Sequence, residues 1–144
     1  MPTVHHSPNA WVATHIPRFE ETGGQPRPGV NDLLLTTRGR RSGELRHTAL
    51  VYERDGDRYV VAASNRGADQ HPAWYLNLLV HPYVTVQVGP ENFTAYACPT
   101  TAEERPRLWR LMVSARSEYA AYQQRSSRQI PVVLLNRALP TDGA

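Results

Sequence analysis

Short apolar runs that alternate with turn residues limit this chain to a fold rich in β-sheet. The clearest turn lies at residues 54–57, where Asp-Gly separates two apolar runs and gives a strong short-range signal for a β-hairpin. Most of the runs follow one another through short turns, which indicates antiparallel pairing. The segments predicted to be strands are 32–37, 47–54, 58–64, 83–88, 93–99 and 129–138.

The distribution of apolar residues within these runs indicates how the sheet is arranged. The last run, 129–138, is apolar nearly throughout, so it is predicted to be central or to line a barrel. Several strands are apolar on both faces, which favours closure into a small barrel over an open sheet. We therefore expect a mainly β protein with helices (α+β), built on about six antiparallel strands. No glycine-rich phosphate loop follows a strand, which argues against a Rossmann or P-loop fold.

Helices are predicted from capping residues and apolar spacing. The first begins at Asn9, which can cap it, and the second follows Pro72, a residue suited to a first helical turn. The third opens at Thr-Ala-Glu-Glu, residues 101–104, which matches a capping box. The predicted helices are 9–22, 73–80, 101–112 and 117–125.

The 144 residues are most simply one domain, long enough to bury a core. We expect some parts of the chain to be folded and others to be disordered. They are a disordered N-terminus at 1–8, the N-terminal helix and a linker rich in Gly and Pro at 9–29, the barrel domain at 30–138 and a C-terminal tail at 139–144.

Composition narrows the function classes. All 16 positive residues are Arg, but a net charge of +3 argues only weakly for nucleic acid. Cys98 is the single cysteine and the six His lack metal-ligand spacing, so we expect neither a disulfide framework nor a metal site. Without a signal peptide or an apolar run of membrane-spanning length, a cytoplasmic protein is expected. Peripheral membrane contact through the helix at 9–22 stays open, as does the choice between monomer and homodimer.

Residues 38–46, Arg-Gly-Arg-Arg-Ser-Gly-Glu-Leu-Arg, form the most unusual stretch, which we call the arginine loop. Guanidinium groups bind phosphate and carboxylate in a bidentate way, and glycines let backbone N–H groups approach an anion. Four arginines in one hairpin loop therefore suit an anion site. On charge alone, a solvated hairpin tip in a chain rich in Arg explains them equally well.

Three other stretches suit a ligand site, and each has a plainer explanation. Ser64, Asn65 and Gly67 suit close backbone contact with a ligand, or a simple turn. Asn77 stands among apolar residues, so it needs a hydrogen-bond partner if it is buried. Tyr119 and Tyr122 share a helical face, where they either donate protons to an acceptor or form a packed aromatic pair.

In this order the motifs resemble the deazaflavin-dependent nitroreductase family, actinobacterial enzymes that use reduced coenzyme F420. The resemblance covers roughly Leu33 to Leu135. It rests on "LLLTTRGRRSGELR", "DGDRYVVAAS" followed by "GA", "HPAWYLNL" and "YQQRSSRQIPVVLL". It implies a split β-barrel related to flavin-binding oxidases, in agreement with the strand pattern.

The resemblance also implies a site. Arg40, Arg41 and Arg46 hold the phosphate and oligoglutamate tail of F420, with FMN a less favoured cofactor. The catalytic positions are Tyr119 and Tyr122, which match tyrosines over the acceptor pocket, together with Ser64. The other cofactor-binding positions are Ser42, Thr48, Leu50, Ala62, Ala63, Ser64, Asn65, Ala73, Trp74, Tyr75 and Asn77.

Four residues depart from the family pattern. Arg41 stands where Lys is common, Arg66 where Gly is usual and Ala49 where the family has Pro. Arg116 occupies the place of an aromatic residue in some relatives, which puts the choice of acceptor in doubt.

The function expected from the resemblance is hydride transfer from reduced F420 to a small-molecule acceptor: a quinone, an activated alkene or a nitroaromatic. A non-catalytic carrier of F420 or a flavin is the alternative. Binding of nucleic acid is not expected, because no aromatic residues alternate with the arginines of the loop.

Overall fold

The computed structural model describes residues 4–6 and 31–138, with the side chains of 31–138. The predicted helix at 9–22, the linker to residue 29 and the C-terminal tail lie outside the described residues. Val4–His6 form a short strand, β1, which pairs in parallel with β3. The prediction of disorder therefore does not hold for these three residues, because the edge of β3 offers backbone groups with which they pair.

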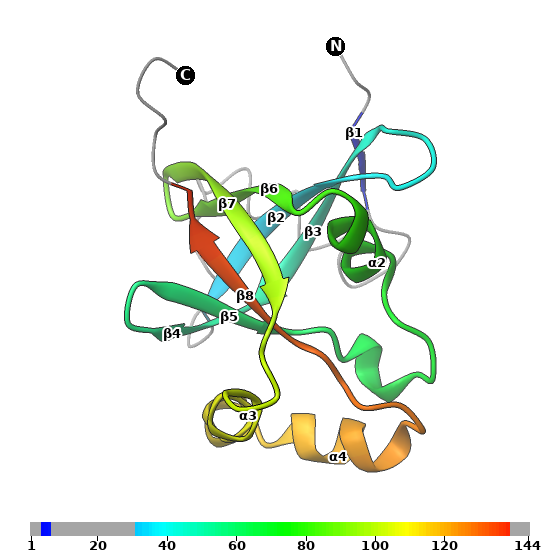
Figure 1. The fold of residues 1–144 in the computed structure, drawn as a ribbon, viewed down its shortest axis with the longest axis vertical. Coiled ribbons are helices and arrows are strands. Elements are labelled where there is room, and N and C mark those ends of the chain that lie inside the picture. The colour runs from blue at the N-terminus through cyan, green and yellow to red at the C-terminus, as the bar shows by residue number, and fades with distance from the viewer. Residues whose placement is uncertain (1–3, 7–30, 139–144) are drawn as a thin grey trace.

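The remaining elements confirm a mainly β protein with helices (Figure 1). The strands are β2 (Asp32–Arg38), β3 (Leu45–Val51), β4 (Glu53–Asp55), β5 (Arg58–Ala62), β6 (Tyr83–Val88), β7 (Glu91–Pro99) and β8 (Val132–Arg137). The helices are the 3₁₀ turn η1 (Asn65–Gly67), α2 (Ala73–Val80), α3 (Arg105–Ala115) and α4 (Glu118–Arg125). Within the described ranges, no helix is long and apolar enough to cross a membrane.

The sheet has the strand order β1-β3-β2-β6-β7-β8-β5-β4, and every pair except β1–β3 is antiparallel. The single strand predicted at 47–54 is in fact two strands, β3 and β4, which lie at opposite edges of the antiparallel part. Only Tyr52 separates them in the chain. The sheet must therefore curl until its two edges meet at this residue, which produces a split barrel.

Strand β8 confirms the prediction of a central strand buried on both faces. Val133 and Leu135 face a core inside the curl, with Leu33, Leu35 and Trp74. Val132 and Leu134 face a second core on the opposite side of the sheet. That second core is closed by side chains of the helices α3 and α4, among them Leu108, Met112 and Tyr119.

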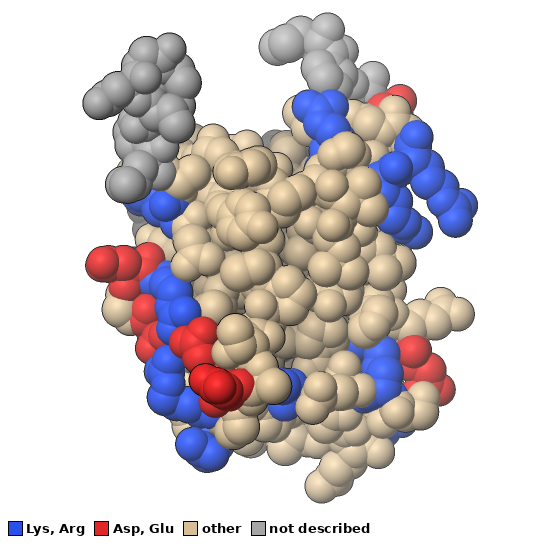
Figure 2. Space-filling view, viewed as in Figure 1, with Lys and Arg blue, Asp and Glu red and all other residues tan. Residues whose placement is uncertain are grey.

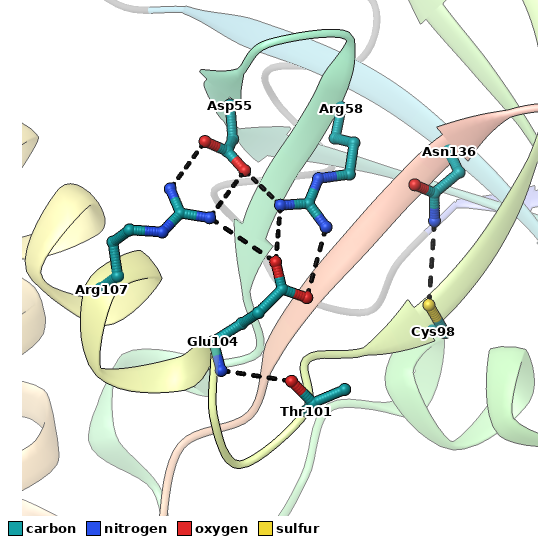
Figure 3. Close-up of polar contacts among 7 residues, drawn as sticks. All are labelled: Asp55, Arg58, Cys98, Thr101, Glu104, Arg107 and Asn136. Atoms are coloured by element: carbon teal, nitrogen blue, oxygen red, sulfur yellow. Dashed lines mark hydrogen bonds and ion pairs between the residues drawn. The ribbon is translucent and has the colours of Figure 1, made fainter.

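A cluster of charged residues fastens α3 to the β4–β5 hairpin (Figure 3). Arg58 on β5 binds the carboxylates of Asp55 and, at 2.8 Å, Glu104. Arg107 binds the same two carboxylates at 2.8 and 3.5 Å. Thr101 Oγ1 accepts a hydrogen bond from the Glu104 N–H at 3.2 Å, as the predicted capping box requires. The Glu104 side chain, however, turns to Arg58, and the helix begins at Arg105.

This cluster gives the fold an acid-sensitive component. Hydrogen bonds from Arg107 and then Arg58 hold the pKa of Asp55 well below its usual range. The carboxylate therefore stabilises the fold fully above its unfolded-state pKa of about 4, and this contribution falls as the pH drops further. We predict that Asp55→Asn lowers Tm by about 2–5 °C at pH 7. The difference should shrink as the pH falls toward 3, followed by thermal unfolding monitored by circular dichroism.

Asp57→Asn is the matched control, since Asp57 is exposed at the tip of the same hairpin. It should leave Tm nearly unchanged. Equal effects of the two substitutions would show that Asp55 acts only through the overall charge of the protein.

Candidate functional site

A cavity of about 480 Å³ opens between the arginine loop, the adjoining ends of β2 and β3, and the N-terminal end of α2. Figure 2 shows one group of basic side chains at the upper right, where Figure 1 places the β2–β3 loop; other basic side chains lie at the lower left, next to acidic ones. The lining residues are Thr37, Gly39, Arg40, Arg41, Ser42, Arg46, His47, Thr48, Asn65, His71, Pro72, Ala73, Trp74 and Asn77.

The arginine loop is held in shape mainly by its own backbone. The Gly39 N–H donates to the Glu44 carbonyl at 2.7 Å, and the Gly43 N–H donates to the Gly39 carbonyl at 2.9 Å. A Cβ atom at Gly39 would lie 2.8 Å from Ser42 Oγ, so a larger residue would displace that side chain. Gly43 has a φ of +74°, a conformation that glycine adopts without strain. Arg38 donates to the Gly43 carbonyl at 2.7 Å, so it braces the loop and does not line the cavity.

Asn77 on α2 anchors the arginine loop to the barrel. Its Oδ1 accepts hydrogen bonds from the Arg40 backbone N–H at 3.1 Å and from Arg40 Nη1 at 3.0 Å. Its Nδ2 donates to Thr37 Oγ1 at 3.4 Å. The side chain is 2% exposed, so the partner that its burial requires is the loop itself. Asn77 therefore positions Arg40 in the loop.

The lining of the cavity is positively charged. Arg40, Arg41 and Arg46 contribute guanidinium groups, and no carboxylate is among the lining residues of the described chain. Neither Arg41 nor Arg46 makes an ion pair or a side-chain hydrogen bond with another described residue, whereas the arginines around Asp55 are paired. The N-terminal end of α2 borders the same space and adds the positive end of a helix dipole. This donor set suits an elongated anionic ligand.

The turn beside the cavity has an unusual backbone. Asn65, Arg66 and Gly67 have φ values of 46°, 56° and 83°, so three successive residues are left-handed. Arg66, which stands where the family usually has Gly, adopts a conformation that costs a non-glycine residue about 1 kcal/mol or more. A Cβ atom at Gly67 would lie 3.0 Å from the Tyr122 carbonyl oxygen, so glycine is needed where α4 packs against this turn.

The structure brings together nine of the predicted residues and separates the others from the cavity. Ala63 and Tyr75 belong to the core inside the curl, and Leu50 packs against it. Ala62 belongs to the second core. Ser64 precedes η1, and its carbonyl accepts the Gly67 N–H at 2.8 Å. The nine that line the cavity are Arg40, Arg41, Ser42, Arg46, Thr48, Asn65, Ala73, Trp74 and Asn77.

Tyr119 and Tyr122 lie on α4 as an aromatic pair with ring centroids 6.2 Å apart, and neither lines the cavity. Tyr119 is buried in the second core, next to Trp109. Burial raises the pKa of Tyr119 to about 12, so its hydroxyl stays protonated at neutral pH. The catalytic role of the two tyrosines stays a prediction.

Five lining residues were not singled out from the sequence: Thr37, Gly39, His47, His71 and Pro72. Thr37 on β2 lies opposite Arg46 on β3. Pairing of the two strands on either side of the loop therefore brings Thr37 to the cavity together with Arg46. His71 and Pro72 directly precede α2, whose first two residues were predicted. His71 and Pro72 could have been identified because they are adjacent in the sequence to the predicted positions Ala73 and Trp74.

Comparison with known proteins agrees with this geometry. The family model described as F420H(2)-dependent quinone reductase matches residues 11–137. The chain belongs to this family. An F420H(2)-dependent quinone reductase of Mycobacterium tuberculosis strain H37Rv is 42% identical over 118 residues, which cover 79% of each chain.

Two solved structures are similar in both sequence and fold. An F420-H2 dependent reductase (FDR-A) is 36% identical, with a TM-score of 0.68 over 74% of this chain and 94% of its own. A protein described as a domain-swapped dimer is 35% identical, with a TM-score of 0.71 over 90% of this chain and all of its own. The predicted family and the split barrel are thus confirmed.

The anchor of the arginine loop can be tested without a ligand. We predict that Asn77→Ala lowers the free energy of unfolding by about 1–3 kcal/mol, because Thr37 and Arg40 lose a buried partner. The released loop should also be cut faster by trypsin after its arginines. Urea unfolding and limited trypsin digestion with peptide mapping measure the two effects. Asn92→Ala, at an exposed position on β7, is the control; a loop cut equally fast in both variants would contradict the anchoring role of Asn77.

Proposed function

We propose that this protein is an F420H2-dependent quinone reductase that binds the deazaflavin cofactor in the cavity beside the arginine loop. The observation that carries the proposal is a cavity that, among the described residues, is lined by three arginines and no carboxylate, in a chain of the F420H2-dependent quinone reductase family. Activated alkenes and nitroaromatics are further acceptors that the same chemistry allows.

The residues present fit such a cofactor. Arg41 and Arg46, which have no ion-pair partner among the described residues, can pair with a phosphate or with carboxylates, and Arg40 is held at the cavity by Asn77. The volume of the cavity is in the range that suits a ligand of this class. Ala73 leaves room at the start of α2, and Trp74 offers an apolar wall against which a flat ring can pack.

The chemistry of the reaction belongs to the cofactor, since bound reduced deazaflavin supplies a hydride from C5. The protein would bind and orient the cofactor and exclude water from the reaction. The arginines would hold the anionic tail and so orient the cofactor in the cavity.

Turnover separates an enzyme from a non-catalytic carrier. We predict that the purified protein accelerates the oxidation of F420H2 by menadione, followed through the visible absorbance of oxidised F420. A carrier would bind F420 tightly and leave this rate unchanged.

Tyr119→Phe and Tyr122→Phe test the predicted tyrosines in the same assay. A catalytic tyrosine lowers turnover at unchanged F420 affinity, and a packing tyrosine lowers Tm instead.

The proposed role of the arginine loop can be tested by measuring the affinity of loop variants for F420. Arg41→Ala and Arg46→Ala should each weaken F420 binding by about 1.5–3 kcal/mol, because each removes a hydrogen bond to a charged group. Binding should weaken further as salt is added, since exposed charges are screened. Fluorescence titration of F420 measures both effects.

Arg110→Ala is the matched control, because Arg110 is exposed on α3, away from the cavity. Arg40→Ala is less informative, since it also breaks the bond to Asn77. Equal affinities for the wild type, Arg41→Ala and Arg46→Ala would show that the anionic tail binds elsewhere.

The location and assembly of the protein stay predictions. We expect a cytoplasmic enzyme whose partner is a small-molecule acceptor. A homodimer and peripheral contact with a membrane through residues 9–22 are open to test by light scattering and vesicle sedimentation.

A further inference from the structure

Residues 125–128, Arg-Ser-Ser-Arg, connect α4 to β8 and grip the segment 64–71, which borders the cavity. We call residues 125–128 the clamp. Each of its members bonds to that segment, across a sequence distance of about sixty residues. The bonds of its first three members run from Arg125 Nη1 to the Arg66 carbonyl (3.2 Å), from Ser126 Oγ to the Ala68 carbonyl (3.0 Å), and from Ser127 N and Oγ to Asp69 Oδ1 (2.8 and 3.0 Å).

Arg128 reaches furthest into the segment. Its Nη2 donates to the Ser64 carbonyl at 3.0 Å, and its Nε donates to the Ala68 carbonyl at 3.1 Å. Its Nη1 lies 3.1 Å from Nδ1 of His71, a residue that lines the cavity. One guanidinium group thus fixes both ends of the segment and one ring nitrogen of a cavity histidine.

This contact determines where the His71 ring carries its proton. A guanidinium group has only N–H donors, so Nδ1 must be the acceptor and the proton of the neutral ring must sit on Nε2. A second proton on Nδ1 would face the Arg128 cation. Burial, and then the charge of Arg128, lower the pKa of His71 below its usual value.

The surroundings of His71 reinforce this state. Its ring packs against Tyr75, with centroids 4.8 Å apart. The charged groups nearby are Arg128, with Asp69 close to it, and the cavity arginines 40, 41 and 46. No carboxylate of a described residue lines this space. Since Nδ1 is taken, Nε2–H is the polar group that His71 has to offer a ligand.

We propose that His71 is a hydrogen-bond donor of the active site, positioned by Arg128, and that its Nε2–H binds a carbonyl oxygen of a conjugated ring. The inference rests on the proposed function, because the ring belongs either to the deazaflavin or to the quinone. A neutral imidazole is a weak acid, so it stabilises charge on the oxygen by hydrogen bonding and does not transfer its proton. Arg128 is a positioning residue that acts through His71.

The protonation of His71 can be measured without cofactor. We expect ¹⁵N NMR of the full-length protein at pH 8 to show one histidine, identified by its loss in His71→Gln, as the neutral Nε2–H form. In Arg128→Met the same ring should mix its tautomers and titrate closer to about 6.5, the ordinary histidine value. A His71 ring that is protonated at pH 7, or that carries its proton on Nδ1, would overturn the proposal.

Ligand measurements then identify the ring that His71 binds. His71→Leu removes the donor, whereas His71→Gln keeps an N–H donor without charge. We expect about a 3–10-fold loss in the leucine variant, as for one neutral hydrogen bond, and partial recovery in the glutamine variant. A loss in affinity for oxidised F420 assigns the bond to the deazaflavin; a raised KM for menadione at unchanged F420 affinity assigns it to the quinone.

The outcomes separate this inference from the proposed function. Wild-type protein that does not bind F420 refutes the proposed function, whatever the NMR shows. Wild-type protein that binds F420, together with a His71→Leu variant of unchanged F420 affinity and menadione KM, refutes the role of His71. His81→Gln, at the C-terminal end of α2, is the control and should match the wild type in both measurements.

Discussion

Burial of β5 and β8 on both faces is the constraint on which the rest of the structure depends. One face of these strands fills the inside of the curled sheet and the other face holds α3 and α4. Without the second core, α4 would have no place on the sheet, and the clamp that follows it could not reach the segment 64–71. The cavity on one side of the sheet is therefore shaped by packing on the other.

The arginine loop shows how the protein concentrates positive charge. Bringing Arg40, Arg41 and Arg46 together is unfavourable, and the cost is offset by contacts that do not neutralise them. Asn77 is uncharged, so it holds Arg40 in place without cancelling its charge. The carboxylates of Asp55 and Glu104 pair with other arginines, outside the cavity. Arg41 and Arg46 pair with no described residue, which keeps their attraction available to an anionic ligand.

The sequence predicted what depends on local pattern. The helix at 73–80 and the strand at 83–88 match α2 and β6, because capping and alternation act within a few residues. The sequence did not predict that the strand ends at Val51 and a new one begins at Glu53. The apolar pattern continues across Tyr52, so it does not reveal that the chain passes from one edge of the sheet to the other. The contact of Arg128 with His71 was also beyond the sequence, because it joins residues 57 positions apart. The family resemblance named Asn77 as a site position but could not show that its hydrogen-bond partner is the arginine loop.

The left-handed turn at Asn65 and Arg66 connects these observations. Its strained backbone persists only if its surroundings hold it, and the clamp supplies that hold through the carbonyls of Arg66 and Ala68. Glycine at residue 66 would adopt the same conformation with less strain and would need less support. With Arg at this position, the clamp must stabilise the turn as well as orient His71. The guanidinium of Arg128 contributes to both, through its bonds to the Ser64 and Ala68 carbonyls and its contact with His71. A change in the conformation of the turn is therefore expected to change the position of the His71 ring.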